Sequence, residues 1–108
     1  MFEKSSDFGY TEAVPAVYRK TLVFGEKTLL TEFRMQKGSS LPAHAHPYEQ
    51  TGYLVRGRLR LTIGAESFDV CPGDSWSIGS NIPHGAQILE DSVAIEVFSP
   101  VRQDYLPA

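Results

Sequence analysis

The residues whose spacing most clearly suggests chemistry are the three histidines of the chain. His44 and His46 stand two positions apart in a stretch that reads as extended, and His84 follows directly after a proline. Imidazole is a common protein ligand of zinc, nickel, iron and copper. Side chains two positions apart on a strand point to the same face. We therefore expect His44, His46 and His84 to converge on one metal ion.

Gln50 is the expected fourth ligand, and Glu49 is the alternative. Gln50 shares the strand phase of His44 and His46, whereas Glu49 offers the better ligand chemistry and Pro47 could introduce a bulge that resets the phase. Three imidazoles and a neutral amide leave a divalent ion its full charge. Such a shell favours a Lewis acid over the two-histidine, one-carboxylate sites of iron oxygenases. We expect one divalent transition metal, with zinc, nickel, iron and manganese all open.

The composition is that of one globular domain. The 108 residues are 42% hydrophobic and 21% charged, as in ordinary soluble domains. A net charge of -3 provides no basic field for a phosphate backbone, which argues against nucleic acid as a partner. The first residues lack the apolar run of a signal peptide, and no stretch reaches the ~20 apolar residues of a membrane span. We expect a cytoplasmic protein with no membrane partner.

Hydrophobic side chains alternate with a period of two from Thr21 onward. The alternation is clearest over 31–36 and 58–63, and glycine, proline or asparagine interrupts the pattern between segments. Further strands are expected at 51–55, 67–70, 75–78, 86–89 and 93–98. Many short strands without a 3.6-residue period predict a closed or double-sheet all-β domain of the jelly-roll class.

The amino-terminal segment lacks this regularity. Residues 1–19 contain scattered aromatic side chains and no strict period, which predicts an arm, while residues 20–106 form the barrel. The aromatic residues of such an arm need a surface to cover. We expect the arm to reach across to a partner in a homodimer, where it would protect an exposed sheet edge.

The two histidine segments resemble the two sequence motifs of the cupin family. The segment Gly38-x5-His44-x-His46-x3-Gln50-x6-Gly57 is similar to the first motif, and Gly73-x10-His84 is similar to the second. In cupins the first motif supplies two histidines and a Glu or Gln, and the second supplies one histidine. The resemblance implies a single-domain cupin jelly-roll barrel. It also implies that the metal ligands are His44, His46, Gln50 and His84.

The carboxyl-terminal strand adds a carboxylate where apolar residues are expected. Glu96 shares a strand face with Phe98, and Arg102 follows shortly after. Charged residues are rarely buried unless paired, so Glu96 either lies on a solvated face or pairs with Arg102, or it is a general acid or base tuned by burial. The sequence alone leaves these alternatives open.

This tail resembles that of the pectin-degradation cupins, which linearise 4,5-unsaturated monouronates to 5-keto-4-deoxyuronates. In that family an Asp, a Phe and an Arg of the tail lie in the pocket, and the matching positions are Glu96, Phe98 and Arg102. The resemblance implies a lyase or isomerase that binds a small carboxylate or sugar acid. Arg102 would grip the carboxylate and Glu96 would move the proton. Glu96 is one methylene longer than the Asp of the family.

The apolar wall of the pocket is assigned to Phe98, with Tyr53 or Trp76 as further candidates, although core packing is the expected role of Trp76. Two other functions stay open at this point. A cupin dioxygenase would need an oxygen-active metal and would consume oxygen. A non-catalytic module that binds a small ligand would show no turnover.

Overall fold

Eight antiparallel strands form one hydrogen-bonded sheet that folds over itself in a computed structural model, which describes residues 1–107. The strands are β1 (Thr11–Val14), β2 (Val17–Phe24), β3 (Leu29–Met35), β4 (Ser40–His44), β5 (Glu49–Ile63), β6 (Glu66–Val70), β7 (Ser75–Ile78) and β8 (His84–Ser99), followed by a single 3-10 turn, η1 (Gln103–Tyr105). The expected all-β architecture is confirmed. No helix among residues 1–107 has the length and apolar character needed to cross a membrane.

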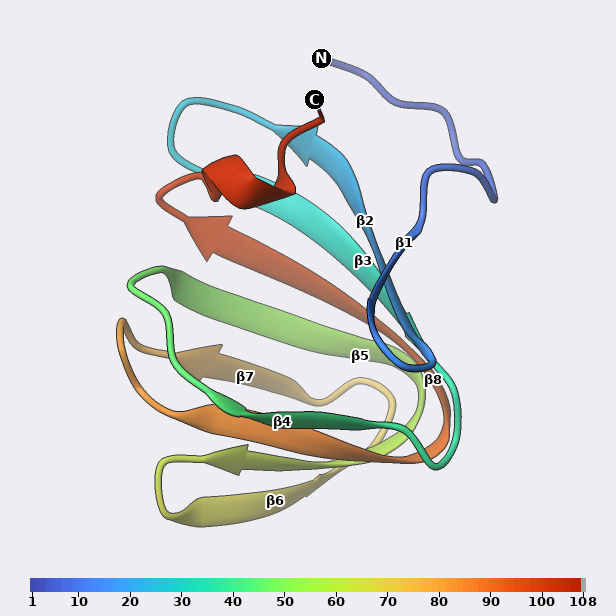
Figure 1. Cartoon of the computed structure of the whole chain (residues 1–108), viewed down its shortest axis with the longest axis vertical. Coiled ribbons are helices and arrows are strands. Elements are labelled where there is room, and N and C mark those ends of the chain that lie inside the picture. The colour runs from blue at the N-terminus through green and yellow to red at the C-terminus, as the bar shows by residue number, and fades with distance from the viewer. Residues whose placement is uncertain (108) are drawn as a thin grey trace.

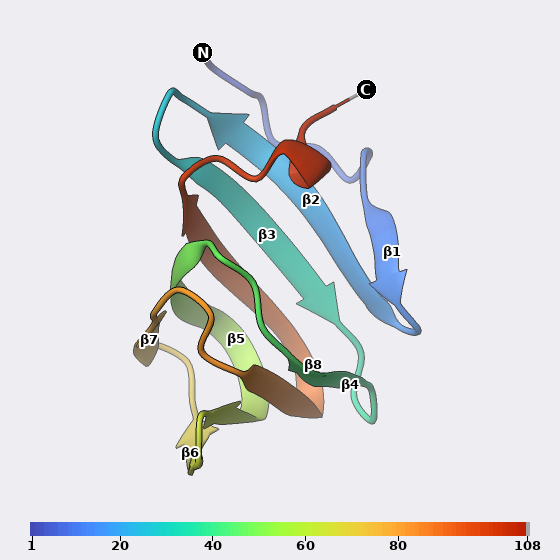
Figure 2. The ribbon, with the colours of Figure 1, turned by 60° about the vertical axis from the view of Figure 1, so that its left-hand side comes forward.

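The long strands β5 and β8 run side by side through both layers of the fold (Figure 1). The first half of β5 and the second half of β8 lie in the larger layer with β1, β2, β3 and β7. Their other halves lie in the smaller layer with β4 and β6. Figure 2 shows how the two layers enclose the interior between them. The result is a jelly roll in which β5 and β8 belong to both layers.

Each long strand bends where it passes between the layers. The β5–β8 register shifts between Leu54 and Leu59, and Gly57 in the middle of this stretch has a φ of +96°. A Cβ at Gly57 would lie 2.2 Å from Ser92 Oγ and 2.4 Å from the Asp91 carbonyl oxygen. A glycine is therefore required both for the backbone conformation and for the close approach of β8.

The continuity of these strands corrects the strand boundaries expected from sequence. Segments 51–55 and 58–63 are one strand, as are segments 86–89 and 93–98. A glycine bend changes the direction of a strand without ending its hydrogen bonding. Gly57 therefore interrupts the alternating sequence pattern, while the strand itself continues through it. The core follows the period-two pattern and contains Val17, Leu29, Phe33, Leu54, Leu59 and Phe98.

Part of the amino-terminal segment expected as an arm is strand. Residues 11–19 contribute β1 and the beginning of β2, which pair with each other. Before them, Tyr10 donates a hydrogen bond to Glu32, and the Asp7 carboxylate lies 3.2 Å from Arg34 Nη1. Glu32 and Arg34 alternate with the inward residues of β3, so this segment covers the outer face of the larger layer.

We expect Gly57→Ala to destabilise the fold more than Gly38→Ala does. Gly38 also has a positive φ, +89°, but nothing lies within 4 Å of its hypothetical Cβ. Backbone strain alone should cost about 1 to 3 kcal/mol at either site, and the overlap at Gly57 should add about 2 kcal/mol. Urea unfolding of both variants measures the difference. Equal losses would show that β8 moves aside without cost.

Candidate metal centre

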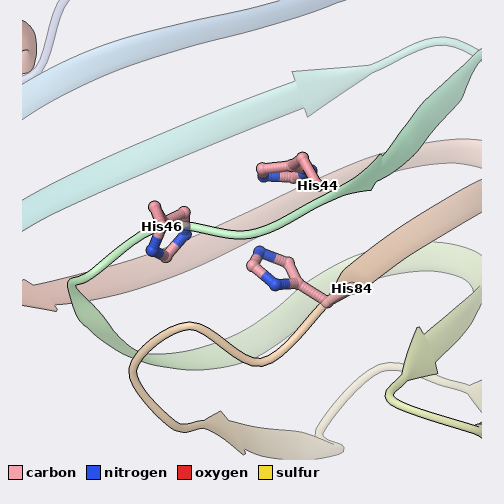
Figure 3. Close-up of side chains that lie close together, drawn as sticks. All are labelled: His44, His46 and His84. Atoms are coloured by element: carbon pink, nitrogen blue, oxygen red, sulfur yellow. The ribbon is translucent and has the colours of Figure 1, made fainter.

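The three histidines meet at one end of the space between the layers. His44 ends β4 and His84 begins β8, and the two are register partners. His46 lies two residues beyond β4 and turns back toward them (Figure 3). One ligating nitrogen from each ring lies within 4.8 Å of the others. The expected convergence of the histidine pair with His84 is present in the structure.

Backbone carbonyls orient all three rings in the same way. The Nδ1–carbonyl distances are 2.9 Å for His44 to Pro42, 3.0 Å for His46 to Tyr48 and 2.8 Å for His84 to Ile82. A carbonyl oxygen only accepts hydrogen bonds, so each neutral ring carries its proton on Nδ1. Each Nε2 then presents a lone pair. This backbone support is typical of metal-ligating histidines.

Two features of the site fit a divalent cation. His84 Nε2 is buried and has no hydrogen-bond partner among residues 1–107. His46 Nε2 lies 3.0 Å from Gln50 Oε1, which brings two lone pairs together without a proton between them. Both arrangements are costly in a buried place unless a cation accepts the lone pairs.

Burial also favours the ligating form of the imidazoles. Loss of hydration lowers the pKa of both His46 and His84 below the usual value, and the nearby Arg102 charge lowers each further. A lowered pKa keeps the ring neutral at pH 7, and the neutral ring is the form that binds metal.

Gln50 connects the histidines to Glu96. It is buried on the inward face of β5, whereas Glu49 is exposed on the other side of the strand. The Gln50 amide places Oε1 beside His46 and donates from Nε2 to Glu96 Oε1 at 2.6 Å. An ionised glutamate at this position could not donate that hydrogen bond and would bring two carboxylates together. The amide is therefore the side chain that suits both neighbours.

Glu96 lies on the inward face of β8 and is 9% exposed. Its Oε1 accepts hydrogen bonds from Gln50 Nε2 and from Trp76 Nε1, the latter at 2.9 Å. Burial raises the pKa of Glu96, and these two hydrogen bonds partly offset the rise. Of the alternatives left open by the sequence, the structure excludes a solvated face, and no ion pair joins Glu96 to Arg102 within residues 1–107.

Arg102 is held at the same cavity by aromatic rings and by Asp104. Its guanidinium carbon lies 3.8 Å from the centroid of Tyr105 and 5.0 Å from those of Tyr48 and Phe98. Asp104 accepts hydrogen bonds from Nη2 at 2.8 Å and from Nε at 3.3 Å. This leaves Nη1 without a hydrogen bond to any residue of the described chain, so it is free for an anionic group.

These groups share one cavity of about 360 Å³. Its polar lining includes the three histidines, Gln50, Glu96 and Arg102. Its apolar lining includes Phe33, Met35, Leu41, Leu59, Leu61, Trp76, Ile78 and Phe98. A mostly apolar chamber with a few converging polar groups is typical of small-molecule sites.

Two aromatic assignments from the sequence need correction. Tyr53 is 49% exposed and lies on the outer face of β5, because Gln50, Gly52 and Leu54 occupy the inward positions of the same strand. It does not line the cavity. Trp76 does line the cavity and donates to Glu96, so it has a polar contact that an assignment to core packing missed. No local pattern marked this contact, because Gly52 comes to lie opposite Trp76 only through the pairing of β5 with β7.

Comparison with known proteins identifies the family. The model of the Cupin domain matches residues 31–99. The chain belongs to the cupin family. The expected single-domain cupin jelly roll is thereby confirmed.

Several cupins resemble this one over much of its length. The pectin degradation protein KdgF of Dickeya dadantii is 28% identical over 99 residues, which cover 90% of each chain. The structure of KdgF from Halomonas sp. has a TM-score of 0.92 at 28% identity, and the match covers 98% of this cupin and all of that chain. Oxalate decarboxylase OxdC of Bacillus subtilis is 32% identical over 88 residues, which cover 77% of this cupin but 22% of that protein.

We expect zinc or nickel to raise the melting temperature of the metal-free cupin. A ligand that binds only the native state stabilises it by RT ln(1 + [L]/Kd), about 2.7 kcal/mol at a hundredfold excess over Kd. His84→Ala should abolish the shift, whereas Gln87→Ala, an exposed position of the same strand, should leave it unchanged. Thermal unfolding combined with metal analysis provides the measurement. An undiminished shift in His84→Ala would contradict the assignment.

Proposed function

We propose that this cupin is a metal-dependent lyase or isomerase that opens the ring of a 4,5-unsaturated monouronate to give the 5-keto-4-deoxyuronate. The observation that carries the proposal is that Glu96 and Arg102 line the same cavity as the four candidate metal ligands. The likeness to two KdgF proteins across nearly the whole chain supports the substrate class. The name of the Dickeya protein assigns that relative to pectin degradation.

The proposed reaction is a proton-coupled ring opening. The hydroxyl on the anomeric carbon loses its proton, and its oxygen becomes the aldehyde oxygen. The bond between the anomeric carbon and the ring oxygen breaks, and its electron pair stays with the ring oxygen as an enolate. A proton then adds to C4, which leaves a ketone at C5 and balances the reaction as an isomerisation.

The side chains divide this work between binding and proton transfer. His44, His46, Gln50 and His84 would hold the divalent ion, which supplies a Lewis acid for a substrate oxygen when bound. Arg102 would bind the substrate carboxylate through the Nη1 group that Asp104 leaves free. The ionic contact fixes the sugar relative to the other groups of the cavity.

Glu96 is the candidate for moving the proton. It is the one carboxylate among the residues that line this cavity in the described chain. A carboxylate within reach of both the hydroxyl and C4 could remove the first proton and return it to carbon. Phe98, packed at 5.8 Å from the His46 ring, contributes the apolar wall that excludes water.

We expect Glu96→Gln and Arg102→Ala to affect different kinetic constants on an unsaturated monouronate. Glu96→Gln should lower kcat by about 10² to 10⁴-fold while metal and ligand binding persist, because a general acid or base acts in the transition state. Arg102→Ala should also raise KM, since a carboxylate clamp binds the ground state as well. Arg56→Ala, on an exposed position of β5, is the control. Steady-state kinetics on metal-loaded protein provides the comparison.

Glu96→Asp further tests the substrate assignment, because it restores the shorter residue of the uronate-opening relatives. Higher activity of Glu96→Asp would support a diverged member of that group. If neither form acts on any unsaturated uronate, the proposal fails. Oxygen uptake would then indicate a dioxygenase, and ligand binding without turnover would indicate a binding module.

We also propose that two copies pair through the outer face of the larger layer. The amino-terminal segment of each copy would pack on the other copy at the rim of this face. This face exposes Tyr53 and Val55, at 49% and 48%, next to the half-buried Ile95. At the rim, Phe2 and Phe8 are each 84% exposed. Exposed apolar residues that cluster on a sheet face are typical of protein interfaces.

We expect the full chain to be a dimer and both Tyr53→Lys and deletion of residues 1–9 to shift it toward monomer. A charge in the middle of an apolar interface is poorly accommodated, and the deletion ends before β1 begins. Phe68→Lys, on β6 of the smaller layer, should remain dimeric. Light scattering after size exclusion gives the mass. A dimer that survives the deletion would exclude the arm, and one that survives Tyr53→Lys would exclude the face.

A further inference from the structure

Glu96 is held by a second donor that does not belong to the metal centre. Trp76 of β7 is the register partner of Gly52 on β5, and Gly52 is the register partner of Glu96 on β8. The three residues therefore form one row across neighbouring strands, in the region where β7, β5 and β8 lie side by side (Figure 1). Trp76 Nε1 reaches from one end of the row to Glu96 Oε1 at the other, a distance of 2.9 Å.

Gly52 makes this reach across the row sterically possible. Neighbouring strands lie ~4.8 Å apart, so a side chain must cross the middle strand to contact the far one. A Cβ on Gly52 would lie 2.2 Å from both Cε2 and Nε1 of the indole. The indole therefore occupies the space where any other residue would place its side chain.

The two hydrogen bonds to Glu96 fall on the same oxygen. Gln50 Nε2 and Trp76 Nε1 both donate to Oε1, at 2.6 and 2.9 Å. Oε2 accepts no hydrogen bond from residues 1–107. Donors from β5 and β7 thus fix the carboxylate by one oxygen and leave the other available.

We propose that Trp76 and Gly52 are positioning residues: they fix the Glu96 carboxylate through Oε1, so that Oε2 is the oxygen that exchanges the proton with the substrate. This inference rests on the proposed function for its chemical consequence. The positioning of the Glu96 side chain by Trp76 does not depend on that function, because it follows from the hydrogen bond across Gly52. A role of Trp76 in packing alone would need the ring but not the N–H group.

The first test measures the contact without any turnover. Trp76 is the single tryptophan of the chain, so ¹⁵N-labelled protein loaded with diamagnetic zinc shows one indole N–H resonance. Glu96→Gln changes the group that accepts the indole N–H and should shift this proton resonance. Glu90→Gln, at an exposed position of the same strand, should leave it in place. An unmoved resonance in Glu96→Gln would overturn the inference.

The second test separates positioning from packing by kinetics on the unsaturated monouronate. Trp76→Phe keeps an aromatic ring and loses the donor. Misplacing a reacting group by ~1 Å can cost ~100-fold in rate. Because Gln50 still holds the Glu96 carboxylate in this variant, we expect a smaller loss, about 10-fold in kcat, with little change in KM. Gly52→Ala should lower kcat at least as much by displacing the indole. Gly25→Ala, where nothing lies within 4 Å of the added Cβ, is the control and should retain wild-type kcat.

The outcomes distinguish this inference from the proposed function. A lower melting temperature of Trp76→Phe with unchanged kcat per folded molecule would assign Trp76 to packing and overturn the inference, while the function would stand. No turnover by the wild type would overturn the function. In that case the indole resonance would still decide whether Trp76 holds Glu96.

Discussion

The antiparallel pairing of β5 with β8 is the interaction on which the rest of this cupin depends. It runs from Glu49 opposite Ser99 to Ile63 opposite His84 and continues through the bend at Gly57. Because both strands pass from one layer to the other, a single ladder connects the two layers. The same ladder carries Gln50 and Glu96 on the larger layer and His84 on the smaller one, and all three line one cavity.

This arrangement concentrates polar groups in an otherwise apolar interior. Unpaired polar groups are costly there, and hydrogen bonds join Gln50 and Trp76 to Glu96. The Gln50 amide is central because it can present oxygen to the metal side and donate hydrogen to the carboxylate at the same time. The metal centre and the carboxylate are thereby coupled through one side chain.

Much of this could be predicted from the sequence, because the signals are local. A period of two over 31–36 and 58–63 predicts strands whichever partners they find. The spacing of His44 and His46 requires them to share a face if the chain is extended, and Gln50 follows in the same phase. The strand boundaries were less accessible, because Gly57 interrupts the pattern without interrupting the strand. The face of Tyr53 follows from the phase of Gln50 on the same strand, and it was assigned wrongly.

The sequence by itself determined the strand periodicity, the histidine set and the strand face that Glu96 shares with Phe98, since each depends on residues a few positions apart. Only the tertiary structure decided what Glu96 contacts. Trp76 and Glu96 are twenty positions apart, and they meet because β7 and β8 both pair with β5 at Gly52. Arg102 binds Asp104 rather than Glu96 because the chain turns at η1 directly after it. Contacts of this kind depend on strand order and register, which no local pattern in the sequence encodes.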